Sequence, residues 1–134
     1  MAEIEWLDKY NTGVERIDGP LKKFVEMLNQ LHTKVPGGII TRDATESLVE
    51  VSKFAREFFE DEEQLMQDID FPDYAEHKGE HSALRQWFVK KIVEVKGGRK
   101  LGVDELSGYL GKWLIDHILK EDKRVGQAAT SKMG

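Results

Sequence analysis

The chain has 134 residues, a length that fits a single domain able to bury a core without covalent cross-links. It has no cysteine, which excludes disulfides and thiolate metal ligands and is typical of a cytoplasmic protein. The net charge is −5 with acidic and basic residues mixed along the chain, so we expect no nucleic-acid partner. Residues 1–6 do not resemble a signal peptide, and no apolar run approaches the ~18 residues of a membrane span. We therefore expect a soluble protein with no membrane partner.

The first predicted element is an N-terminal arm over residues 1–16. A helix follows, with Asp18 as its expected N-cap and Pro20 in its first turn, where a missing N–H group does no harm. Apolar residues recur at helical spacing from Ile17 to Leu31. The Pro-Gly-Gly run at 36–38 ends this helix.

Three more helices are predicted along the rest of the chain. The second begins at Thr41 and ends at the Asp-Phe-Pro run of 70–72, the third covers 73–96, and the fourth covers 103–122. The segment 127–134 is small and polar, and we expect it to be a disordered, frayed tail. No segment shows strand alternation. The pattern predicts an all-α fold, an up-down-up-down four-helix bundle over residues 1–126.

Ionisable residues interrupt the apolar stripes of these helices. Glu62 lies on the inward side of the second helix, and His77 and His81 are four residues apart on the third, so they point the same way. His117 lies on the inward side of the fourth helix, and Asp122 follows it by five residues, where the winding can loosen. A buried, unpaired charge costs several kcal/mol, roughly, unless it is neutralised or coordinated.

A divalent metal would explain why these five residues share one core. Imidazoles and carboxylates are good ligands for iron, zinc and manganese, and bundle cores build such sites from facing helices. The alternative is structural, because a single inward histidine is more often a hydrogen-bonded core residue. An error of one residue in helix phase would also place Glu62 and Asp122 on the surface.

The order and spacing of several motifs resemble the bacterial hemerythrins from about Ile4 to Asp122. The motifs that carry the resemblance are Trp6…Gly13…Ile17-Asp18, Phe59…Glu62-Glu63…Leu65-Met66, Tyr74…His77-Lys78…His81 and Trp113-Leu114…His117-Ile118…Asp122. The resemblance implies the hemerythrin four-helix bundle and a non-haem iron centre. In that family a Glu and an Asp bridge two irons, one with three His ligands and the other with two.

The resemblance assigns ligand roles to the five inward residues. The three-His set maps to His77, His81 and His117, and the bridging carboxylates map to Glu62 and Asp122. All five are present in this chain.

The two histidines of the other iron are missing. Their positions map to Leu21 and Phe58, which are apolar. The remaining histidine, His32, lies ~16 Å along the first helix from position 21 and is too far away to substitute. In the family, dioxygen binds at the iron whose histidines are missing here, so reversible oxygen carriage by the usual route is in doubt.

The favoured interpretation is a single-metal site in a protein that is not an enzyme. Iron in it would react with O2, nitric oxide or peroxide in sensing, scavenging or storage, and the sequence leaves zinc and manganese open. One alternative is a two-iron, O2-binding hemerythrin with a modified second site. Another is a metal-free structural or interaction bundle, in which Leu21 and Phe58 could be natural or introduced. Protein partners are not indicated.

Overall fold

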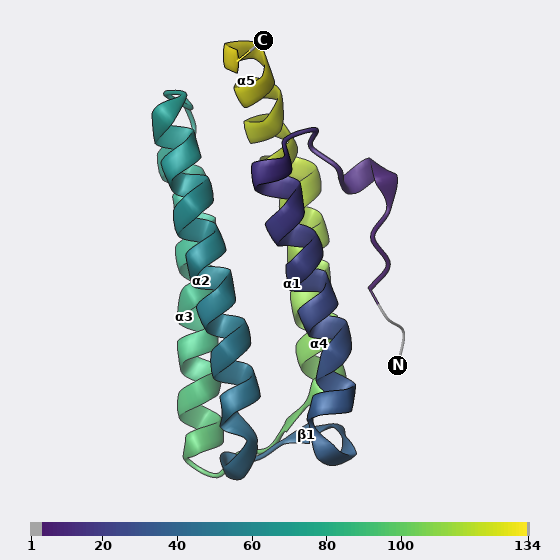
Figure 1. Cartoon of the computed structure of the whole chain (residues 1–134). Coiled ribbons are helices and arrows are strands. Elements are labelled where there is room, and N and C mark those ends of the chain that lie inside the picture. Colours follow the sequence, from purple (N-terminus) through teal and green to yellow (C-terminus); the bar gives the residue numbers. More distant parts are fainter. Residues whose placement is uncertain (1–3, 134) are drawn as a thin grey trace.

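Four long helices form an antiparallel bundle in the computed structural model, which describes residues 4–133 without the side chains of residues 32, 36, 132 and 133. Helix α2 packs against both α1 and α3, and α4 returns beside α1 (Figure 1). The predicted all-α, up-down-up-down bundle is therefore confirmed. The helices are α1 (Glu15–Lys34), α2 (Thr45–Asp68), α3 (Tyr74–Lys96) and α4 (Val103–His117).

A short strand pair ties two of the connections together at one end of the bundle. Strand β1 (Ile39–Ile40) pairs antiparallel with β2 (Leu101–Gly102). The chain reaches β1 through the 3₁₀ turn η2 (Pro36–Gly38), where Gly37 and Gly38 both have φ of +69°, which only glycine adopts without strain. The sequence pattern did not indicate these strands, because two residues are too few to show alternation.

Helix α1 begins three residues before the predicted N-cap. Asp18 lies inside the helix, and its carboxylate accepts hydrogen bonds from the backbone N–H groups of Thr12 and Gly13. It therefore stabilises the turn between the arm and the helix instead of capping the first turn. The prediction that Pro20 lies in the first turn was wrong for the same reason, since Pro20 is the sixth residue of the helix.

The second helix also begins later than expected. Thr41 precedes a 3₁₀ turn, η3 (Arg42–Ala44), makes no side-chain cap hydrogen bond, and α2 starts only at Thr45. For the third helix, the structure agrees with the sequence: Asp73 is the N-cap residue of α3, and Gly97 is its C-cap.

The fourth helix continues beyond the predicted end. After α4 the chain makes one π-helical turn, η4 (Ile118–Asp122), and then α5 (Lys123–Met133) (Figure 1). The expected frayed tail over 127–134 is thus helical as far as Met133, and Gly134 lies outside the described residues. The physical reason is burial, because Val125 and Ala129 are fully enclosed in the core.

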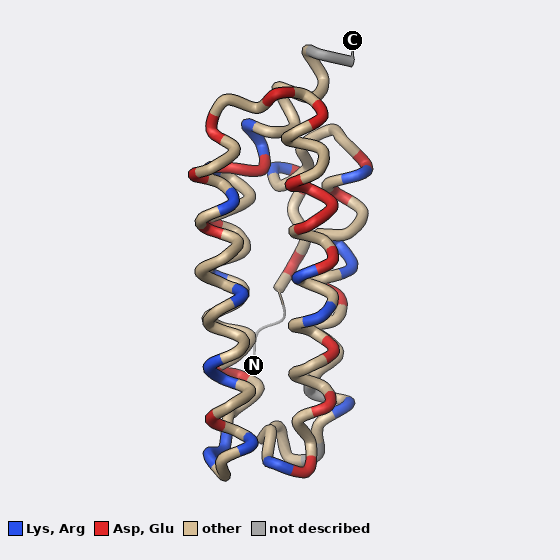
Figure 2. The backbone as a smooth tube through the Cα atoms, turned by 90° about the vertical axis from the view of Figure 1, so that its left-hand side faces the viewer, with Lys and Arg blue, Asp and Glu red and all other residues tan. Residues whose placement is uncertain are grey.

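The apolar stripes of the helices meet in one core that runs the length of the bundle. Charged residues of both signs are spread along the outside, as Figure 2 shows. Two ion pairs join the first turn of α1 to the C-terminal third of α2, because Arg16 approaches both Asp61 and Asp68. Among the described residues, no helix is long and apolar enough to cross a membrane.

A short 3₁₀ turn, η1 (Asp8–Tyr10), lies in the N-terminal arm, which runs back along α1 (Figure 1). The Asn29 side chain on α1 accepts a hydrogen bond from the Ile4 amide and donates one to the Ile4 carbonyl. Tyr10 is buried, and the Trp6 indole donates to Asn11. The arm is therefore part of the packed structure.

Candidate metal centre

All five residues singled out from the sequence meet in the core at the end of the bundle nearest α5. Glu62 comes from the last third of α2, His77 and His81 from the first turns of α3, His117 from the end of α4 and Asp122 from η4. Each residue offers one ligand atom, and these atoms lie within 4.8 Å of one another. All five residues are buried, with at most 3% of their surface exposed.

Local winding explains how α3 and η4 present these side chains. His77 and His81 are one helical turn apart, so both imidazoles leave the same face of α3. His117 and Asp122 are five residues apart, a spacing that a regular α-helix would splay by about 140°. The π-helical turn over Ile118–Asp122 brings the carboxylate back to the side of His117. A helix that loosens at this point was expected from the sequence.

The three histidines point their Nε2 atoms at one shared position. Nε2 of His81 lies 3.1 Å from Nε2 of His77 and 3.1 Å from Nε2 of His117. Oε1 of Glu62 lies 3.0 Å from Nε2 of both His77 and His81. Oδ1 of Asp122 lies 3.2 Å from Nε2 of His77 and 3.1 Å from Nε2 of His117.

Protons alone cannot satisfy this arrangement. Each imidazole brings at most one proton at Nε2, so the short contacts outnumber the hydrogen bonds that can form. Oε2 of Glu62 and both carboxylate oxygens of Asp122 are buried without a hydrogen-bond partner among the described residues. Two nitrogens bound to one metal ion at ~2.1 Å and at a right angle lie about 3 Å apart, as these do. The donor set therefore fits a divalent cation.

The pKa values reflect the same crowding. Burial raises the pKa of Glu62 well above its usual range, and the adjacent Asp122 charge raises it further. Burial lowers the pKa of His81 to about 4. Burial alone would lower the pKa of His117, but the carboxylates of Asp122, Glu80 and Glu62 together outweigh burial and raise that pKa to about 9. Burial alone would raise the pKa of Asp122, but its polar neighbours, with His117 first among them, together hold it below its usual range.

Aromatic rings form one wall of the centre. The Phe59 ring stacks on the His81 imidazole with centroids 4.1 Å apart, and the Trp113 ring stacks on His117 with centroids 4.6 Å apart. Phe59 also touches Trp113 and Phe58, at centroid distances of 5.8 and 5.4 Å. Two of the three histidines are thus held in orientation by the flat faces of aromatic rings.

The two positions where the family resemblance leads one to expect histidine are occupied by hydrocarbon. Leu21 is fully buried on α1, and Phe58 is 5% exposed on α2, one helical turn before Glu62. Both belong to the hydrophobic core. The side chain of His32, the remaining histidine, lies outside the described part of the chain.

The sequence analysis assigned no role to three glutamates that surround the centre. Glu63, Glu80 and Glu121 each place a carboxylate oxygen within 4 Å of the Nδ1 atom of one of the histidines. A signal was present in the sequence, since each of the three glutamates is the immediate neighbour of a ligand candidate. They follow Glu62 and precede His81 and Asp122, respectively.

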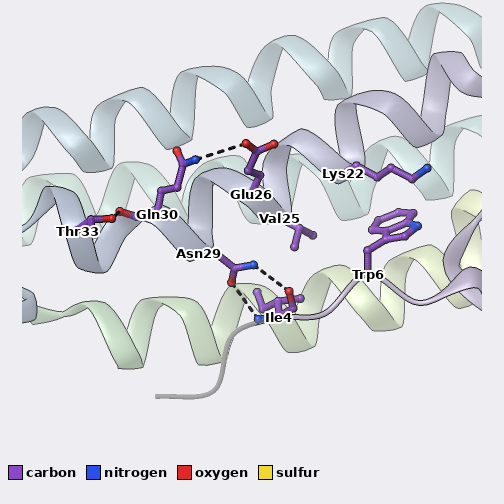
Figure 3. A pocket seen from close by; sticks show the side chains of 8 residues that line it. All are labelled: Ile4, Trp6, Lys22, Val25, Glu26, Asn29, Gln30 and Thr33. Carbon is purple, nitrogen blue, oxygen red and sulfur yellow. Dashed lines mark hydrogen bonds between the residues drawn. The ribbon is translucent and has the colours of Figure 1, made fainter.

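A separate groove lies between the arm and α1, away from the histidines. Figure 3 shows Ile4 and Trp6 of the arm on one side and a face of α1 on the other. The polar atoms here are largely paired with one another, as in the two hydrogen bonds of Asn29 with Ile4 and the one that Gln30 donates to Glu26. This groove therefore marks the contact between the arm and α1.

The fold and the site together define a class: a four-helix bundle that encloses a cation-binding centre of histidines and carboxylates. The family model described as "Hemerythrin HHE cation binding domain" matches residues 12–129. The chain therefore belongs to the hemerythrin family.

Curated relatives and solved structures agree with this assignment. The chain is 34% identical over 122 residues to a bacteriohemerythrin of Pseudomonas aeruginosa, covering 91% of this chain and 78% of that protein. It is 33% identical to a bacteriohemerythrin of Stenotrophomonas maltophilia, with coverage of 92% and 79%. A crystal structure of a hemerythrin point mutant superposes with a TM-score of 0.86 at 26% identity, covering 97% of this chain and 99% of that one. The chain is thus a hemerythrin-like metal-binding domain.

Proposed function

We propose that this chain binds a single non-haem iron ion through His77, His81 and His117, with Glu62 and Asp122 completing the coordination. The observation that carries the proposal is the convergence of three Nε2 atoms on one position, each within 3.2 Å of a carboxylate oxygen. Three nitrogen donors and two carboxylates suit ferrous or ferric iron, and the hemerythrin relatives favour iron over zinc or manganese.

The limit of one ion follows from the residues beside the two carboxylates. A second ion between Glu62 and Asp122 would need further ligands from the side on which Leu21 and Phe58 stand in the family pattern. Both are hydrocarbon and buried, so they offer no donor atom and exclude water that could serve as a ligand. Two carboxylates without nitrogen donors would hold a second iron poorly.

The role of such a centre is ligand sensing or scavenging, with no catalytic turnover. Bound iron would supply a redox-active position open to O2, nitric oxide or peroxide. The protein residues contribute fixed ligands, an apolar wall and exclusion of water. Reversible oxygen carriage by a two-iron route is not part of this proposal, because the residues expected to hold the second iron are absent.

Metal content per chain tests the proposal. The protein is loaded anaerobically with ferrous iron, freed of excess by gel filtration and measured by elemental analysis. One iron per chain supports the single-ion centre. A chain that retains no iron after this treatment would overturn it.

A two-iron, O2-binding centre is the second candidate, and one observation favours it. Oε2 of Glu62 and Oδ2 of Asp122 are buried without a hydrogen-bond partner among the described residues, so each carboxylate has a second oxygen that could bind a second ion. Two irons per chain in the same measurement, together with a visible charge-transfer band in air, would select this candidate over the first.

A further inference from the structure

The outward-facing nitrogen of each histidine meets a different glutamate. Because all three Nε2 atoms point inward, the three Nδ1 atoms point away from the centre. The distances from Nδ1 to the nearest carboxylate oxygen are 2.8 Å for His81 and Glu63, 3.5 Å for His117 and Glu80, and 3.9 Å for His77 and Glu121. One acidic side chain is thus available to each imidazole, from α2, α3 and η4 in turn.

The first of these pairs, His81 with Glu63, forms a hydrogen bond. Nδ1 of His81 lies 2.8 Å from Oε2 of Glu63, and Arg85 donates to the same oxygen at 2.9 Å. Because Arg85 also donates to this oxygen, it acts as an acceptor, so the proton of the neutral imidazole belongs on Nδ1 and the lone pair on Nε2. That tautomer is the one a metal at the shared position requires.

The other two pairs, His77 with Glu121 and His117 with Glu80, lie close together but do not form a hydrogen bond. Nδ1 of His77 and Nδ1 of His117 are both buried without a hydrogen-bond partner among the described residues, and so is Oε2 of Glu121. A movement of about 1 Å would bring the Glu121 carboxylate into hydrogen-bond range of His77. Glu80 is the more accessible partner, with 40% of its side chain exposed.

We infer that Glu63, Glu80 and Glu121 are positioning residues, each of which accepts the Nδ1–H of one histidine and thereby presents its Nε2 to the metal. The inference rests on the proposed metal binding. It predicts an order of importance, because Glu63 makes a short, buried and anchored contact and Glu80 makes a longer, exposed one. Glu63 contributes most to metal affinity and Glu80 least.

The experiment compares two substitutions at the same position. Glu63→Leu removes the acceptor, whereas Glu63→Gln keeps an acceptor oxygen and removes the charge. Zinc affinity is measured by competition with a chromophoric chelator, and the proton on Nδ1 of His81 is followed by ¹⁵N NMR of the zinc-loaded protein. Loss of such an outer hydrogen bond weakens metal binding about 10–100-fold. We expect that loss in Glu63→Leu, with the Nδ1–H signal of His81 broadened or gone, and recovery of most of the affinity in Glu63→Gln.

Glu60→Leu is the matched control, since Glu60 is an exposed glutamate on the same helix. Its zinc affinity should equal that of the unaltered protein. Equal losses in Glu63→Leu and Glu63→Gln would overturn positioning in favour of simple charge attraction, and an unchanged Nδ1–H signal in Glu63→Leu would overturn it directly. If the unaltered protein binds no metal, the proposed function fails before the variants are compared.

The ranking gives a second, independent measurement. Glu121→Leu and Glu80→Leu are titrated with zinc beside Glu63→Leu, so that the same substitution is compared at all three positions. We expect the largest loss of zinc affinity for Glu63→Leu and the smallest for Glu80→Leu. A loss in Glu80→Leu that exceeds that of Glu63→Leu would contradict the assignment of roles from contact distance and burial.

Discussion

Phe59 lies face to face with His81, with ring centroids 4.1 Å apart and ring planes 7° apart. The phenyl ring is 1% exposed and comes from α2, three residues before Glu62. Its other neighbours include Phe58, Trp113 and the guanidinium of Arg85, which lies 5.6 Å from the ring centroid. One side chain therefore packs the core and fixes the plane of a candidate ligand.

Replacing Phe59 tests this double role. Phe59→Ala should lower the free energy of unfolding of the metal-free protein by about 3–5 kcal/mol, the usual cost of truncating a buried phenylalanine. Zinc affinity should also fall, because the His81 ring loses the surface that orients it. Urea unfolding and zinc titration measure the two effects. Phe54→Ala on the same helix is the control: Phe54 is only half-buried, so its loss of stability should be smaller and its zinc affinity unchanged. Equal zinc affinity in Phe59→Ala and the unaltered chain would show that the stack orients nothing.

Removing one proposed nitrogen ligand should weaken metal binding far more than removing Phe59. His77→Ala takes away one of three imidazoles and leaves the carboxylates of Glu62 and Asp122 next to a cavity. We expect iron content to fall from about one to well below one per chain, and zinc affinity to fall by more than 100-fold, more than any outer hydrogen bond contributes. His32→Ala, the remaining histidine, should keep full metal content. Unchanged stoichiometry and affinity in His77→Ala would remove it from the ligand set.

The sequence predicted the bundle and the convergence of its five inward residues because helical spacing is a local property. Histidines four apart on α3 must share a face, and an apolar stripe interrupted by Glu62 shows which side is inward. The partners of the Nδ1 atoms were not predictable in this way. Glu80 and Glu121 lie on different elements, and their approach to His117 and His77 depends on how α3 and η4 pack.

The misjudged boundaries have a common physical origin in contacts that helix propensity does not describe. Asp18 has the chemistry of an N-cap, but its carboxylate reaches back to the amides of Thr12 and Gly13. The segment after Gly126 is rich in small residues, which reads as a frayed end when it is considered alone. In the structure Ala129 is fully buried. Helix propensity is a weak guide where packing decides the outcome.

Placing histidines at the two positions where the family pattern has them tests the proposed single-ion centre. Leu21→His together with Phe58→His should raise iron content from about one to about two per chain and produce a visible charge-transfer band in air. The positions suit this change, because both are buried on the helices that flank the centre. The pair Leu28→His with Val51→His, on the same helices but elsewhere in the core, should leave the iron content at one. A double variant at 21 and 58 that still holds one iron and stays colourless would contradict the placement of the second site.

Packing of α5 against the arm is tested by a glycine on that helix. A Cβ atom at Gly126 would lie 2.6 Å from Cβ of Thr12 and 3.0 Å from its carbonyl oxygen. The backbone of Thr12 cannot shift without disturbing its neighbours. Gly126→Ala should therefore lower the free energy of unfolding by about 1–3 kcal/mol, the usual cost of overpacking.

Gly108 on α4 provides the matched comparison. It is exposed, and a Cβ built there meets no atom within 4 Å. Gly108→Ala should therefore raise the free energy of unfolding by up to about 1 kcal/mol through helix propensity alone. Urea unfolding of both variants gives the sign of each change. If Gly126→Ala were stabilising to the same extent as Gly108→Ala, α5 would not be packed against Thr12. The turn that carries Asp122 would then lack the support of the helix that follows it.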